Sequence, residues 1–117
     1  MCIRDRYKPE FHERRKFDLD KLRTWIRLSP DELKEVAGVF AEKLNQAKGP
    51  VVVLIPQKGW SAADLPGNDT YDPAEDQLFT LVLRERLKPD IQIIEVNANM
   101  EDSEFSNAVV ENALKIF

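Results

Sequence analysis

The sequence predicts an α/β fold, a three-layer Rossmann-like βαβαβα unit built around a small parallel sheet. Two apolar runs carry this prediction, residues 51–55 (VVVLI) and 91–96 (IQIIEV). The first run is apolar throughout, which is typical of a strand buried on both faces of a parallel sheet. Each run is followed by a polar segment and then by apolar residues at helical spacing. Since strands joined by one crossover helix usually pair as neighbours, we expect these two runs to lie side by side and parallel.

The first strand and the first helix are expected before these runs. Residues 21–28 are a weaker strand candidate, which the order of elements places in the same sheet. Ser29-Pro30-Asp31-Glu32 then has the composition of a capping box with proline at the first helical position. The next apolar residues, at three- and four-residue spacing, predict a helix ending near Lys48-Gly49: Leu33, Val36, Ala37, Phe40 and Leu44. Gly38 inside this helix costs about 1 kcal/mol relative to alanine, and we attribute it to close packing on the sheet.

Two more helices complete the unit. Asp72 is expected to be the N-cap of a helix whose apolar stripe runs to Leu87, before Lys88-Pro89 breaks it. The last helix is expected to begin near Ser103. Its inward-facing residues are predicted to be Phe105, Val109, Val110, Leu114 and Ile116.

Residues 1–20 differ from the rest of the chain. They are highly charged and show no helical or strand period, so we interpret them as an irregular lead-in to a domain at 21–117. Residues 1–6 (MCIRDR) look unrelated to the residues after them and are interpreted as a non-native start. Three strands would also leave two open sheet edges, which natural domains usually cover. Both features suggest a piece of something larger.

Composition limits the partners that we expect. The 117 residues suffice for one domain, and a net charge of −4 with a pI near 5.1 gives no electrostatic reason to expect nucleic acid or an anionic membrane. No run of eighteen apolar residues predicts a membrane span. The only cysteine, Cys2, excludes an internal disulfide, which fits a cytoplasmic protein. One histidine and one cysteine make a zinc site improbable, and we predict no metal.

Several short motifs match a known family. The most telling are Lys58-Gly59-Trp60-Ser61, Asp64, the helix start Tyr71-Asp72-Pro73, and Glu95-Val96 leading into an Asn-x-Asn tip, with Arg27 before the capping box. In their order and spacing, residues 21–117 resemble the C-terminal end of an uncharacterised protein family that includes the tomato mosaic virus resistance protein.

The resemblance implies that this chain is the C-terminal fragment of a two-domain protein. Bacterial members of the family carry an ATP-binding N-terminal domain, so we expect no cofactor in this fragment and ATP, if anywhere, in the full-length protein. Two departures matter. Asn97-Ala98-Asn99 stands where the family has Asp-Ala-His, and Phe17-Asp18-Leu19-Asp20 replaces a His-Asn-Pro-like segment. No role resting on that histidine carries over.

Polar residues gather where ligands bind in open α/β sheets, after the carboxyl ends of the strands. The candidate ligand-binding residues are Arg27, Lys58, Ser61, Asp64, Glu95, Asn97 and Asn99. Lys58 and Ser61 suit a phosphate or carboxylate, although no familiar phosphate loop is present. Serine catalysis is disfavoured because the only histidine, His12, lies in the lead-in. Glu95 either forms a structural pair with Arg27 or faces the crevice as an acid or base.

Three functions stay open at this point, and whether the chain is an enzyme is not decided. The leading hypothesis is a domain that contributes to an interdomain crevice and serves ligand binding or assembly, with the missing N-terminal domain and further copies of the chain as partners. The first alternative is an enzyme domain acting on a small anionic or phosphorylated substrate. The second is an oligomerisation module. A cleft grouping polar residues would favour the first two, and an apolar patch without them the third.

Overall fold

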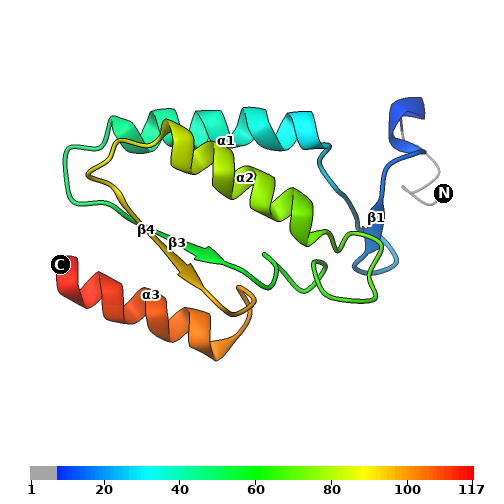
Figure 1. The fold of residues 1–117 in the computed structure, drawn as a ribbon. Helices are drawn as coiled ribbons and strands as arrows, with labels where there is room; N and C mark the ends of the chain where they lie inside the picture. Colours follow the sequence, from blue (N-terminus) through cyan, green and yellow to red (C-terminus); the bar gives the residue numbers. More distant parts are fainter. Residues whose placement is uncertain (1–7) are drawn as a thin grey trace.

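The computed structural model describes residues 8–117, so the proposed non-native start at 1–6 lies outside the described residues. The chain forms three layers (Figure 1): two helices on one face of a two-stranded parallel sheet and a third helix on the other face. The helices are α1 (Pro30–Asn45), α2 (Pro73–Arg86) and α3 (Ser103–Ile116). The strands are β1 (Lys16–Asp18), β2 (Thr24–Ile26), β3 (Val52–Pro56) and β4 (Gln92–Val96), and a 3-10 turn spans Pro9–Phe11.

The parallel sheet consists of β3 and β4. Their register runs from Val52 opposite Gln92 to Pro56 opposite Val96, which confirms the predicted parallel pair. Helix α2 connects the two strands and covers one face, as expected for a crossover connection. The α/β class and the small parallel sheet are therefore as predicted.

The first strand lies elsewhere, and its predicted place in the parallel sheet is wrong. β2 pairs antiparallel with β1, which lies in the segment expected to be irregular. The rings of Phe17 and Trp25 face each other across this pair with centroids 5.9 Å apart. Asp20 closes the turn, because its Oδ1 accepts the N–H groups of Leu22 and Arg23 at 2.8 Å each. Local turn chemistry and one aromatic pair thus form a hairpin that sequence periodicity did not indicate.

The helix starts are as predicted. Ser29 and Glu32 form the reciprocal capping box, with the Glu32 N–H donating to Ser29 Oγ and the Ser29 N–H donating to Glu32 Oε1. Asp72 Oδ1 accepts the N–H of Glu75 at 3.1 Å. Helix α1 ends at Asn45, earlier than expected, because the Asn45 side chain bonds the backbone where α2 ends.

The core lies between α1, α2 and the sheet. Its buried residues are Ala37, Ala41, Ile55, Phe79, Leu83 and Leu87. Gly38 faces α2 and not the sheet, contrary to the prediction: an added Cβ would lie 2.7 Å from Arg86 Nη1. The glycine therefore leaves room for the Arg86 side chain, which lies across α1 at this point.

Helix α3 is much less covered than predicted. Phe105 is buried, but Val109, Val110 and Leu114 are 42%, 57% and 78% exposed. The physical reason is the width of the sheet, since two strands offer too little surface to cover a helical stripe. Within residues 8–117, no helix is both long and apolar enough to cross a membrane.

Candidate functional site

Asn99 ties the loop after β3 to the tip of β4. It is only 3% exposed, and its Nδ2 donates to the carbonyl oxygens of Lys58 and Ser61 at 3.2 Å and of Asp64 at 3.4 Å. Gly59 makes this approach possible, because it has φ +113° and an added Cβ would lie 2.1 Å from the Asp64 oxygen. The two strand ends do meet, as expected for parallel neighbours, and Asn99 is used to join them.

Arg27 lies at the centre of a buried ionic cluster. Its Nε donates to Glu75 at 2.6 Å, its Nη2 donates to Asp76 at 2.7 Å, and its Nη1 donates to the Thr70 carbonyl at 2.6 Å. Asp64 Oδ1 lies 3.6 Å from Nη1. The arginine is held on all sides, and it fastens the β1–β2 hairpin to the start of α2.

The predicted pair of Arg27 with Glu95 does not form. Glu95 instead lies 3.6 Å from Arg84, and both side chains are about half exposed. Arg15 supports the cluster from the hairpin, reaching Glu75 at 2.8 Å and Asp72 at 3.0 Å. Arg27 directly follows β2, which pairs with β1 and not with the parallel sheet. The arginine therefore contacts α2 and not β4.

Asp76 is a functional candidate that the sequence reasoning missed. Burial, together with the neighbouring Asp64 carboxyl, raises the pKa of Asp76 to about 7. Asp64 Oδ1 is buried without a hydrogen-bond donor, and a proton held by Asp76 would supply one. The available signal was spacing: Asp76 stands on the same helical stripe as Phe79 and Leu83, which places an acid on a buried face.

The remaining predicted residues do not share one cleft. Arg27, Ser61 and Asp64 line a hollow of about 150 Å³ below the hairpin. Ser61 Oγ accepts the N–H of Ala63 at 3.2 Å, which is a local turn bond. Lys58 and Asn97 are exposed and line neither this hollow nor the pocket between β3 and α2.

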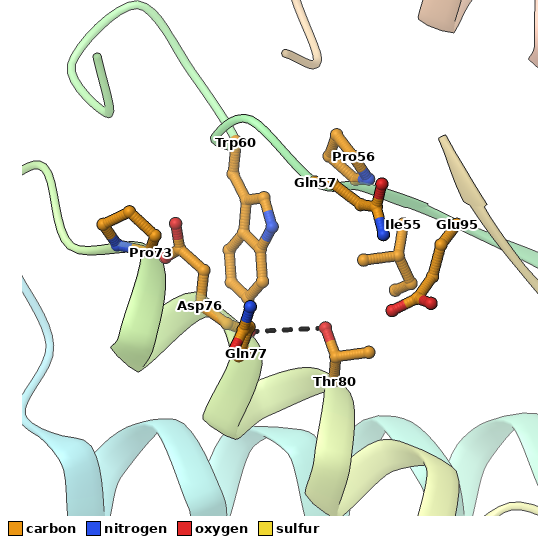
Figure 2. Close-up of a pocket in the computed structure, with 9 residues that line it drawn as sticks. All are labelled: Ile55, Pro56, Gln57, Trp60, Pro73, Asp76, Gln77, Thr80 and Glu95. Carbon is orange, nitrogen blue, oxygen red and sulfur yellow. Dashed lines mark hydrogen bonds between the residues drawn. The ribbon is translucent and has the colours of Figure 1, made fainter. Parts of the chain in front are cut away.

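That second small pocket, of about 140 Å³, opens between the end of β3 and the first turns of α2 (Figure 2). Asp76 and Glu95 bring two carboxyl groups to its wall, and among residues 8–117 no basic side chain lines it. The Trp60 Nε1 atom is buried without an acceptor. The other lining residues are Ile55, Pro56, Gln57, Pro73, Gln77 and Thr80.

An apolar groove of about 490 Å³, larger than either polar site, runs between α1 and β3. Phe40 and Met100 line it and remain 52% and 46% exposed. All of its lining residues are apolar or aromatic: Leu28, Leu33, Val36, Phe40, Leu44, Val52, Val53, Leu54, Ile55, Pro56, Trp60, Phe79, Leu83 and Met100.

The pKa of Asp76 has a consequence for stability. Between its ordinary value of 3.8 and about 7, the folded chain keeps a proton that the unfolded chain has lost. The contribution of Asp76 to the free energy of unfolding is therefore expected to fall as the pH rises from about 4 to about 7. In Asp76→Asn this decline should disappear, as measured by urea unfolding at pH 5 and pH 7.5. Asp31→Asn, on a 97% exposed side chain, removes the same charge and should keep the decline. An equal decline in wild type and Asp76→Asn would contradict the assignment.

The fold and its contacts define an α/β domain with a two-stranded parallel sheet, a buried arginine–carboxylate cluster and an exposed apolar groove. The chain belongs to an uncharacterised protein family, UPF0261, whose C-terminal domain matches residues 2–117.

Relatives from plants and bacteria agree with this assignment. The chain is 36% identical over 110 residues to the ToMV resistance protein Tm-1(GCR237) of Solanum lycopersicum and 34% identical over 108 residues to a UPF0261 protein of Clostridium tetani. It is 31% identical over 88 residues to a UPF0261 protein of Mesorhizobium japonicum. The matches cover 92%, 92% and 74% of this chain but only 15%, 27% and 22% of the relatives. The chain thus matches the C-terminal domain of the family and spans about a quarter or less of the length of these relatives.

Proposed function

We propose that this chain is a docking domain, which assembles with the remainder of a longer UPF0261 protein and contributes one wall of a crevice between its parts. The observation that carries the proposal is the apolar groove between α1 and β3. Exposed apolar surface of this kind marks a binding surface in soluble proteins, because its contact with water is unfavourable.

The polar residues support assembly over independent catalysis. Arg27 and Asn99 donate hydrogen bonds to backbone carbonyl groups of the loop after β3. The Ser61 hydroxyl accepts a hydrogen bond within a turn. The alternative, an enzyme for an anionic substrate, finds less support, because the pocket in Figure 2 presents the carboxyl groups of Asp76 and Glu95. Nucleotide binding in the remainder of the longer protein stays a prediction.

The oligomerisation module is the second alternative. Helix α3 favours it, since its apolar residues Val110 and Leu114 are exposed. This helix lies across the parallel sheet from α1 (Figure 1). Docking to the remainder of the protein and self-association make different predictions about the isolated chain. An oligomerisation module is an oligomer alone, whereas a docking domain binds the missing part.

Phe40→Asp is expected to weaken docking by about 2 kcal/mol or more, roughly 30-fold in Kd, because it places a charge on the exposed lining of the apolar groove. The binding partner in this test is the part of the Clostridium tetani UPF0261 protein outside the matched region, and the measurement is isothermal titration with the 117-residue chain. Met100→Asp, at the other side of the groove, should have a similar effect.

Leu81→Asp is the matched control, since Leu81 is a helical residue that is 57% exposed and does not line the groove. Circular dichroism should show all three variants folded. Equal loss of binding in Phe40→Asp and Leu81→Asp would show that the groove is not the docking surface. Absence of any complex with the wild-type chain would refute the docking function itself.

A further inference from the structure

One edge of β3 is unpaired within residues 8–117, where β4 is its single neighbour. The Gln57 N–H donates to the Val96 carbonyl at 2.8 Å, so residue 57 directs its backbone groups towards β4. Successive residues of a strand direct their backbone groups to opposite sides, and the groups of Val52 and Leu54 therefore face the free edge. Such an edge is a template for another strand.

The helices indicate that a strand position is vacant at this edge. α1 and α2 lie on the same face of the sheet and pack against each other (Figure 1). α2 is the crossover between β3 and β4. In right-handed strand–helix–strand connections, the face that the helix covers fixes the direction in which the chain moves across the sheet. Because α1 lies on the same face as α2, a strand connected to β3 through α1 would lie on the side of β3 away from β4. Residues 21–28 precede α1 but are taken into the hairpin with β1, so α1 covers a position that holds no strand.

The apolar lining of the groove suits a buried strand at this vacant position beside β3. α1 contributes Leu33, Val36 and Phe40 to one wall, and β3 contributes Val53 and Leu54 to the other. A strand inserted beneath α1 would cover this apolar surface and pair the free backbone groups of β3. Pro56, which has no N–H, marks where this ladder would end, because proline is tolerated where a strand is not required to donate.

We propose that the groove receives a β-strand that hydrogen-bonds to the free edge of β3, supplied by the part of the longer UPF0261 protein that this chain does not match. This rests on the proposed docking function and specifies its contact. The source is argued from length: the chain spans 27% of the Clostridium tetani relative, which leaves most of that protein available to supply the strand. The sheet of the assembled domain is then continuous across the junction, with β3 as an interior strand.

Residue-resolved amide exchange tests this contact, using the 117-residue chain alone and mixed with the unmatched part of the Clostridium tetani protein. In the isolated chain the Leu54 N–H should exchange faster than the N–H groups of Val53 and Ile55, which face β4. In the mixture the exchange of Leu54 should slow by about tenfold or more, since it gains a hydrogen bond. Val53 and Ile55, which are already bonded, are the internal controls and should change less.

Each other outcome overturns the proposal in a distinguishable way. A complex in which Leu54 exchanges as in the isolated chain would mean that something other than a strand covers the groove, and docking would stand without the strand. Protection of Leu54 in the isolated chain, together with a dimeric mass in solution, would make a second copy the occupant. No complex at all would remove the docking function and the strand contact together.

Discussion

Replacement of Arg27 by alanine is expected to lower the free energy of unfolding by about 3–5 kcal/mol at pH 7, the usual cost of breaking a buried ion pair by removing one partner. The Arg27 side chain is 12% exposed, and its guanidinium group donates hydrogen bonds to Glu75, to Asp76 and to the carbonyl oxygen of Thr70. Its loss leaves buried carboxylates without a counter-charge. Urea unfolding followed by tryptophan fluorescence measures the change.

The electrostatic origin of this loss can be separated from lost packing. The deficit of Arg27→Ala should shrink between pH 8 and pH 5, because the buried Asp76 carboxyl, whose pKa is raised to about 7, takes up a proton over this range and no longer needs a counter-charge. Arg27→Lys should recover only part of the stability, because one ammonium group cannot make the three separate contacts of the planar guanidinium group. Arg84→Ala is the matched control: its pair with Glu95 is exposed, and it should change stability by less than about 0.5 kcal/mol. A deficit that is independent of pH would assign the effect to packing.

The features that were predictable from sequence follow from patterns that have one dominant structural outcome. The caps at Ser29 and Asp72 depend on residues three positions apart, and both were confirmed. The parallel pairing of β3 and β4 follows from two apolar runs separated by one helix.

What could not be predicted depends on which of several possible partners a strand or helix finds in the folded chain. The order of elements in the chain suggested that β2 belongs to the parallel sheet. In the structure, β2 pairs instead with the three residues of β1. That choice moved Arg27 from the expected neighbourhood of Glu95 to the start of α2, 48 residues away in sequence. The same limit applies to α3, whose apolar residues were expected to be buried although the sheet is too narrow to cover them.

The sequence predicted that the loop after β3 and the tip of β4 lie together, but it did not predict one cleft or the contacts of the residues there. The loop after β3 and the tip of β4 do come together, and Arg27, Ser61, Asp64 and Asn99 lie in that region. Sequence could not show that Asn99 is buried and bonded to three carbonyl groups, because a strand-tip asparagine equally suits a turn or a ligand. Asp76 was missed because acidic residues are common in the first turn of a helix. This explained its neighbour Glu75 and gave no reason to single out Asp76.

Gly59→Ala is expected to cost about 2–5 kcal/mol, which combines backbone strain with steric overlap. Gly59 has φ +113°, and an added Cβ would lie 2.1 Å from the Asp64 carbonyl oxygen and 2.7 Å from Asn99 Nδ2. Because this methyl group would force apart the three carbonyls that Asn99 holds, the loop after β3 should also lose its amide protection. Urea unfolding and amide exchange measure the two effects.

Gly67→Ala separates strain from overlap. Gly67 also has a positive φ, +96°, but an added Cβ there would meet nothing within 4 Å. Its cost should therefore be the strain alone, about 1–2 kcal/mol, with the protection of residues 58–64 retained. If the two substitutions cost the same, close contact between Gly59 and the Asn99 side chain would contribute nothing to stability. A larger loss in Gly59→Ala, localised to this loop, would establish that Asn99 holds the two strand ends together and so shapes the edge of the crevice that the docking proposal requires.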